Sequence, residues 1–213
     1  MIKAFFLLFE PVVAWDRLAQ SRRGVGFILA TYLLPTLLII AAVESWGLVT
    51  MGKWQPVFQK TRDFHLPEHL GEVVAFGVAQ FLLSLAVVFV SALLIKNISG
   101  TFRESHNFRQ AFILVAYSLS PLFLLRLLDA IPTMHPMVTW SLGITLTIWV
   151  MYQGLPRVLQ PDPTHAFGLY ISSVIVVVLT SGVVRLVTGL YILGRADFHH
   201  SWLTNKFPQL FGQ

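Results

Sequence analysis

The chain contains no cysteine and few charged residues, and both deficits limit the class of protein to which it can belong. The absence of cysteine among 213 residues excludes disulfide bonds, thiol nucleophiles and cysteine-ligated metal sites. Only 12% of the residues are Asp, Glu, Lys or Arg, against about 25% in a typical soluble domain. Hydrophobic residues make up 55%, and the mean hydropathy is +0.70. The composition therefore indicates an all-α membrane protein with one compact bundle.

Motifs for catalysis and metal binding are missing as well. The chain has no phosphate-binding loop, no Gly-x-Ser-x-Gly and no His-Glu-x-x-His. Asp129 lies in an apolar segment but has no partner nucleophile nearby in the sequence. His65 and His69 stand in a loop interrupted by Pro67, where histidines are usually solvated rather than metal ligands. We therefore expect no enzyme activity, no catalytic residue, and neither a cofactor nor a metal site.

Five segments have the roughly 20 mostly apolar residues that a spanning helix needs. They are Gly24–Val43, Val73–Ile95, Phe108–Ile131, Met137–Leu155 and Phe167–Leu193. Pro132 and Pro136 bracket a very short connection, so the third and fourth segments are predicted to form an antiparallel hairpin. The pattern predicts three regions: an interfacial segment 1–23, a five-span domain 24–194 and an interfacial tail 195–213. The two flanks are too short and broken to span, and we expect a short helix on the membrane surface at each end.

The distribution of basic residues predicts the orientation. Counted near span ends, one side of the membrane carries eight Lys or Arg residues and the other five. The first group is Lys3, Arg17, Arg22, Arg23, Lys96, Arg103, Arg109 and Arg157, and the second is Lys53, Lys60, Arg62, Arg195 and Lys206. Basic residues favour the cytoplasmic side. The sequence therefore predicts a cytoplasmic N-terminus and an external C-terminus.

Two spans share a proline-containing pattern. Span one reads FILATYLLP and span three FILVAYSLSP, so that Tyr32 precedes Pro35 and Tyr117 precedes Pro121. A proline within a helix removes a hydrogen bond and bends the axis. Paired interrupted spans also occur at the substrate sites of transporters. Alternatively, the similarity between spans one and three is a chance agreement between two segments rich in Leu and Ile, since membrane helices tolerate proline. These four residues are the candidate helix-kink positions.

Charged residues near the external span ends form a second candidate site. Arg126 and Asp129 in span three, Arg185 in span five, and Glu44 and Glu72 at the ends of spans one and two are predicted to lie at a similar depth. A charge in hydrocarbon costs roughly 2.5–3.5 kcal/mol on insertion scales and needs a partner. The cluster is either a structural set of ion pairs or a pocket in which the arginines bind an anionic lipid headgroup.

Several short motifs follow one another in the order of a known family. They are Pro11–Leu18 (PVVAWDRL), Gly100 with an aromatic residue two positions on, Ala116-Tyr117 before Pro121, Ile131-Pro132, and Gly154-Leu155 ahead of the loop to Ala166. In these motifs the chain resembles the YIP family of Ypt/Rab-interacting integral membrane proteins. The resemblance implies five spans, a cytoplasmic N-terminus and no catalytic residue. Eukaryotic members have a longer acidic-aromatic N-terminal region, so the chain looks like the short bacterial-type branch, and Rab binding is not carried over.

The sequence thus favours a non-enzymatic, multi-pass scaffold in a bacterial inner membrane that organises the membrane or binds partners. The expected partners are membrane lipids, anionic ones included, and a membrane protein or a second copy of the chain, but no nucleic acid. The alternative is a small transporter or channel whose polar site is formed by kinked spans one and three together with span five.

Overall fold

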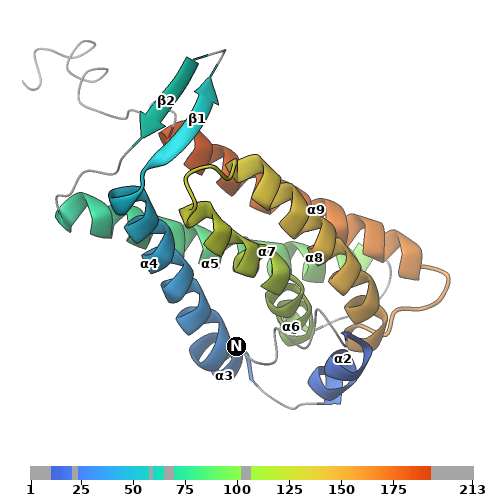
Figure 1. Cartoon of the computed structure of the whole chain (residues 1–213). Helices are drawn as coiled ribbons and strands as arrows, with labels where there is room; N and C mark the ends of the chain where they lie inside the picture. The colour runs from blue at the N-terminus through green and yellow to red at the C-terminus, as the bar shows by residue number, and fades with distance from the viewer. Residues whose placement is uncertain (1–10, 21–23, 58–59, 65–69, 102–106, 193–213) are drawn as a thin grey trace, which may run out of the picture.

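The computed structural model describes residues 11–20, 24–57, 60–64, 70–101 and 107–192, which form a helical bundle with one short hairpin (Figure 1). The first half contains α2 (Pro11–Gln20), α3 (Val25–Ile28), the π-helix η1 (Leu29–Leu33), α4 (Leu34–Thr50), β1 (Lys53–Val57) and β2 (Lys60–Phe64). The second half contains α5 (Leu70–Thr101), α6 (Phe108–Ser118), α7 (Ser120–Arg126), the 3-10 helix η2 (Leu127–Ala130), α8 (Pro136–Val158) and α9 (Ala166–Ile192).

Four helical runs in the described part of the chain are long and apolar enough to cross a membrane. They are Val25–Thr50, Leu70–Thr101, Phe108–Ala130 and Ala166–Tyr191. The predicted helical, multi-pass architecture is therefore confirmed. Helix α8 has 23 residues and packs against α6, α7 and α9, but it is more polar and is not among the four. Its crossing of the membrane stays a prediction.

Several helices extend beyond the ends predicted for them from the sequence. Helix α4 continues to Thr50 instead of ending before Glu44, because this carboxylate is buried inside the bundle and does not need to reach water. Helix α5 is longer than predicted at both ends, and α8 runs past Pro156 to Val158. The expected loop between the first two spans contains an antiparallel hairpin, with Lys53 opposite Phe64, which the sequence analysis did not anticipate.

The α6–α7 segment forms the centre of the bundle. Every residue from Ala111 to Phe123 is buried, since α6 packs against α5 and α8, and α7 packs against α8 and α4. A helix that is apolar on all sides lies either in a protein core or in the lipid of a membrane. Protein surrounds this span, so the other helices supply the outer surface of the bundle.

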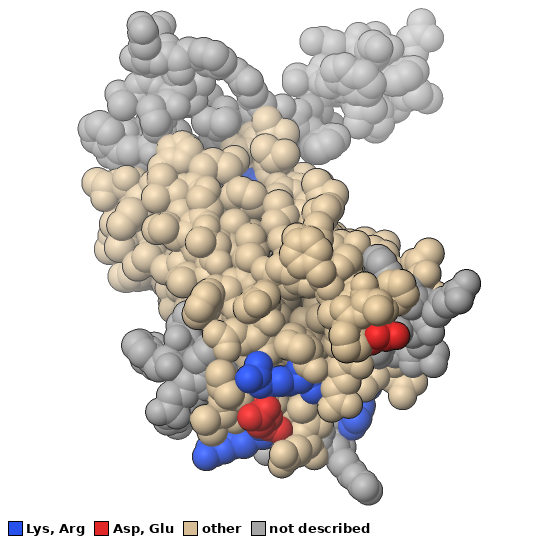
Figure 2. All heavy atoms as spheres, turned by 90° about the vertical axis from the view of Figure 1, so that its right-hand side faces the viewer, with Lys and Arg blue, Asp and Glu red and all other residues tan. Residues whose placement is uncertain are grey.

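The outer surface is apolar over most of its length. Large hydrophobic side chains are exposed along α5 and α9, including Leu82, Leu94, Leu179 and Leu186. Figure 2 shows most of the charged side chains of one face in its lower half, toward the end where α2 lies in Figure 1, below a broad region with little charge. Such a surface suits the hydrocarbon of a bilayer, with the charged end in the headgroup region or in water.

Helix α2 is fixed to the bundle through a tryptophan. Trp15 is fully buried against α8, and its indole Nε1 donates a hydrogen bond to the Val150 carbonyl at 3.1 Å. The ring lies over Gly154, where an added Cβ would come within 2.4 Å of it, so only glycine permits this approach. A helix occupies Pro11–Gln20 and packs against α8. The predicted short helix on the membrane surface at each end of the chain stays a prediction, and residues 1–10 and the tail 195–213 lie outside the described residues.

Candidate functional site

The first part of the candidate site is built around Arg126, the last residue of α7. Its Nη2 donates to Glu44 Oε2 on α4 at 2.5 Å and to Gln80 Oε1 on α5 at 2.9 Å. Its Nη1 donates to Ser84 Oγ, also on α5, at 2.6 Å. The side chains of Arg126 and Glu44 are only 11% and 3% exposed. Thus one guanidinium group joins three helices inside the bundle.

The second part is built around Arg185 on α9. Its Nη2 donates to Asp129 Oδ2 on η2, to Thr139 Oγ1 at 2.9 Å and to the Pro136 carbonyl at 2.7 Å. Asp129 Oδ1 in turn accepts a hydrogen bond from Thr139 at 2.5 Å. The side chains of Arg185 and Asp129 are 7% and 2% exposed. This pair fastens α9 to the start of α8 and to the end of the central span.

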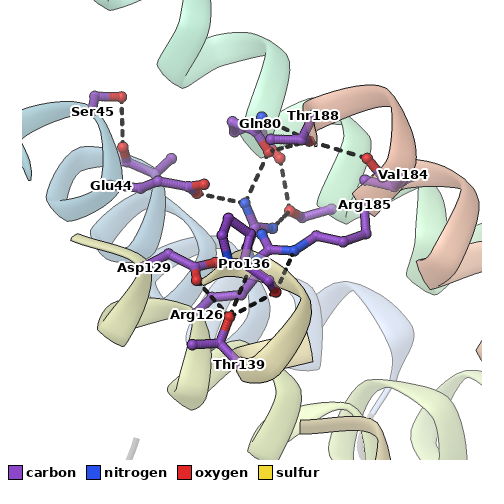
Figure 3. A network of polar contacts seen from close by, with 12 residues as sticks. Glu44, Ser45, Gln80, Arg126, Asp129, Pro136, Thr139, Val184, Arg185 and Thr188 are labelled. Atoms are coloured by element: carbon purple, nitrogen blue, oxygen red, sulfur yellow. Dashed lines mark hydrogen bonds and ion pairs between the residues drawn. The ribbon is translucent and has the colours of Figure 1, made fainter. Parts of the chain in front are cut away.

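Gln80 and Thr188 connect α5 with α9 beside the two pairs. Gln80 accepts from Arg126 through Oε1 and donates through Nε2 to Thr188 Oγ1 at 3.0 Å. Figure 3 shows these side chains converging from separate helices. We call the residues that form these contacts the ion-pair network. Its members are Glu44, Gln80, Ser84, Arg126, Asp129, Pro136, Thr139, Arg185 and Thr188, and all except Ser84 are labelled in Figure 3. With two arginines and two carboxylates, the network is neutral when all four groups are ionised.

The structure brings together four of the five residues of the predicted cluster. Glu44, Arg126, Asp129 and Arg185 are part of the network, whereas Glu72 is exposed in the first turn of α5. Gln80, the α5 residue of the network, lies eight positions further along the helix, or roughly 12 Å at 1.5 Å per residue. Glu72 is therefore too far along α5 to share the network's arginines.

Sequence reasoning missed several polar members of the network. Gln80 and Ser84 are spaced i, i+4 on an otherwise apolar helix, which places both on one face. That spacing was the available signal for a polar contact inside α5. Thr139 and Thr188 gave no comparable signal, because threonine in a membrane helix commonly bonds to its own backbone, as Thr188 also does to Val184 at 3.0 Å.

Two of the four candidate kink residues, the tyrosines, meet inside the bundle. The rings of Tyr32 and Tyr117 are stacked, with centroids 4.8 Å apart and planes inclined by 10°. The Tyr32 hydroxyl lies 2.5 Å from Ser120 Oγ. Pro35 and Pro121 stand in the first turns of α4 and α7. Both proline-containing spans are interrupted at this level, one by η1 and the other by the break between α6 and α7.

Hollows near these sites are small or apolar. A cavity of about 30 Å³ lies between α5, α7, α8 and α9 and is lined mostly by apolar atoms, although Ser84, Arg126 and Arg185 are among its lining residues. A larger groove of about 630 Å³ lies between α4 and α5 and is lined almost entirely by apolar side chains, and its Ser45 bonds to the Ala41 carbonyl at 2.7 Å. Neither hollow presents several converging free polar groups of the kind that bind a solute.

The described residues contain no group of three His, Asp or Glu side chains that could hold a metal ion. His135 caps α8, its Nδ1 accepting from the Met137 amide at 3.2 Å. The loop histidines His65 and His69 lie outside the described residues.

Comparison with known proteins gives one result. Residues 5–185 match the family profile described as the Yip1 domain, which covers most of the chain and the described helices from α2 to Arg185 in α9. Neither the curated proteins nor the solved structures yield a match.

Proposed function

Because the chain belongs to the Yip1 domain family of membrane proteins, we propose that it is a non-enzymatic scaffold that organises the membrane or binds a membrane-protein partner. The proposal places function on the outer surface of the bundle rather than in a reaction or transport site at its centre. The match to the family profile identifies the family, and the contacts inside the bundle support the scaffold role.

The observation that carries the proposal is the closed ion-pair network. Each arginine is held by a carboxylate and by at least two further acceptors. Removing one partner from a buried pair typically costs about 3–5 kcal/mol, so such pairs do not open readily for a passing solute. Charges inside a membrane bundle otherwise mark substrate paths. Here both arginines are paired with a carboxylate, and Arg126 Nε is the one guanidinium nitrogen of the two pairs that is buried without a hydrogen-bond partner among the described residues. The pairing of all four charges supports a locking role.

The proposed arrangement in the membrane has five spans, with α8 as the fifth. The length of α8 and its contacts with α6, α7 and α9 support this. The excess of basic residues at the α2 end supports a cytoplasmic N-terminus in a bacterial inner membrane and an external C-terminus. Fusing a reporter active only in the cytoplasm to either end tests this topology. Activity at both ends, or at neither, would reject an odd number of spans.

Lipids and a protein partner are the proposed ligands. Arginine suits phosphate through its bidentate fork, but an anionic headgroup at Arg185 has to compete with Asp129 for the same guanidinium group. We therefore place lipid contact mainly on the apolar surface. Native mass spectrometry of wild type and Arg185→Lys tests this, since lysine retains the charge but loses the fork. Equal retention of anionic lipid supports surface contact, and loss in the variant favours a headgroup site.

The direct test of the scaffold proposal is purification in mild detergent followed by native mass spectrometry. A second copy or a membrane protein should remain bound in a fixed ratio, and Arg157→Gln, which removes a partly exposed ion pair and a hydrogen bond to the Gln153 carbonyl of the same helix, should leave that ratio unchanged. A strictly monomeric protein without a partner, in several detergents and in lipid nanodiscs, would reject the proposal.

One observation favours the transporter alternative: the two interrupted spans meet at the stacked tyrosines, and interrupted spans form the binding sites of many transporters. The Tyr32–Ser120 contact fills this place with side chains of the protein itself. Solute-dependent flux or current in proteoliposomes, abolished by Tyr32→Ala, would favour transport over the scaffold.

A further inference from the structure

Two neighbouring spans of the bundle are broken at the same level by related means. In span one, the Leu34 amide donates to the Leu29 carbonyl, an i to i+5 bond that widens the helix just before Pro35. In span three, α6 ends at Ser118 and α7 starts at Ser120, one residue before Pro121. A proline lacks the amide hydrogen that would continue the helical ladder. Helical interruptions of this kind are recognised causes of kinks.

A hydroxyl group repairs the backbone at the break in span three. Pro121 cannot donate to the Tyr117 carbonyl, and Ser120 Oγ does so instead, at 2.6 Å. A side-chain hydroxyl on a freed carbonyl satisfies hydrogen bonding without fixing the helical angle as a backbone amide does. In span one, Thr36 Oγ1 donates to the carbonyl of Tyr32, four residues earlier, at 2.7 Å, a back-bond that often bends helices. Both breaks are therefore less rigid than a regular helix.

The two breaks are joined to each other. Tyr32 from η1 stacks on Tyr117 from α6, and the Tyr32 hydroxyl contacts Ser120 Oγ at 2.5 Å. All three side chains are buried. Two flat stacked rings can slide or tilt with little loss of contact, since offset arrangements are favourable for aromatic pairs. The contact between the Tyr32 hydroxyl and Ser120 Oγ joins η1 to the start of α7, so bending at one break acts on the other.

Beyond the breaks, α4 and the α7–η2 segment are tied together as one unit. Glu44 of α4 pairs with Arg126 of α7, and Gly47 packs so closely on Ala130 that an added Cβ would lie 2.8 Å from it. This unit is fastened to uninterrupted neighbours by other members of the network: Arg126 to α5 through Ser84 and Gln80, and Asp129 to α9 through Arg185.

We propose that Tyr32, Tyr117 and Ser120 form the pivot of a coupled hinge, at which α4 and α7–η2 tilt together relative to α5 and α9, with the Asp129–Arg185 pair as its latch. The uninterrupted helices α5 (Leu70–Thr101) and α9 (Ala166–Ile192) act as the frame. The motion changes the cross-section of the bundle at the end that carries the network and leaves α3 and α6 in place. The hinge goes beyond the scaffold proposal and stands or falls independently of it.

The natural absence of cysteine makes the hinge directly measurable by spin labels at introduced cysteines. One labelled pair, Thr50→Cys with Leu186→Cys, joins exposed positions on α4 and α9 on the latch side. The control pair, Phe27→Cys with Ile171→Cys, joins exposed positions of α3 and α9 on the other side of the pivot. Double electron–electron resonance then gives the distance distribution of each pair in lipid nanodiscs.

The latch is opened by neutralising both of its members, Asp129→Asn with Arg185→Gln, which leaves no unpaired buried charge. In this variant the latch-side pair is expected to gain a second distance, while the control pair keeps its single distance. Adding Pro121→Ala, which restores a backbone donor for the Tyr117 carbonyl, should remove the second distance.

Three results would overturn the hinge: an unchanged latch-side distribution, equal broadening of both pairs, or persistence of the second distance with Pro121→Ala. Equal broadening would mean general loosening of the bundle. If the doubly neutralised protein does not fold, Tyr32→Phe serves as the second variant, because it keeps the ring stack and removes the hydroxyl contact with Ser120. It should broaden the latch-side distribution alone, and no change there would also reject the pivot.

Discussion

Replacing Arg185 by methionine should destabilise the protein strongly, and the structure gives the scale. The substitution keeps an apolar side chain of similar length but leaves the Asp129 carboxylate, 2% exposed, without its arginine. It also removes donors from Thr139 and from the Pro136 carbonyl. Removing one member of a buried pair costs about 3–5 kcal/mol. At about 2–4 °C per kcal/mol for a chain of this size, the melting temperature should fall by about 10 °C.

The double variant Arg185→Met with Asp129→Leu should recover most of this loss, because no buried charge remains unpaired. Arg157→Gln is the matched control: its pair with Asp16 spans 3.1 Å, but the two side chains are 30% and 54% exposed. Exposed pairs contribute about 1 kcal/mol or less, so its melting temperature should hardly change. Thermal melting followed by size-exclusion chromatography measures all three. Equal shifts for the Arg157 and Arg185 variants, or a double variant no more stable than the single one, would refute the reasoning.

Three further predictions concern single contacts. Gly154→Ala should displace α2, because the new Cβ would lie 2.4 Å from the Trp15 ring, and proteolysis between α2 and α3 should therefore accelerate. The control Gly182→Ala should behave as wild type, since its new Cβ would lie 3.5 Å from the Trp140 ring, an ordinary contact distance. Tyr32→Phe should lower stability by about 1 kcal/mol through loss of its hydroxyl contact, and an unchanged melting temperature would contradict that contact. Gln80→Leu should cost about 1–3 kcal/mol, since Arg126 loses an acceptor, and a more stable variant would show that the amide is dispensable.

The membrane class and the span positions were predictable because they depend on local composition. Runs of apolar residues identified the four spans now found as long apolar helices, and the proline positions identified where two of them are interrupted. Where each helix ends was less predictable. A charge such as Glu44 normally marks the edge of a span, but a partner on another helix allowed α4 to continue past it.

The candidate site was predictable in its residues but not in its pairing. Arg126, Asp129 and Arg185 are conspicuous because charges in hydrocarbon are costly. Which carboxylate meets which arginine depends on how the helices cross, and that information is not local in sequence. Gln80 shows the same limit, since only the approach of α7 and α9 to α5 gives its amide two partners.

Central to the proposed function is that the buried charges lock a packed bundle and do not line a solute path. A single cysteine in place of Ser84, which touches both the network and the small cavity, tests this in native membranes with a water-soluble thiosulfonate reagent. Thr50→Cys at the exposed end of α4 is the accessible reference. We predict modification of the cysteine at position 50 and none at position 84. Rapid modification at position 84 from either side would contradict the locking role.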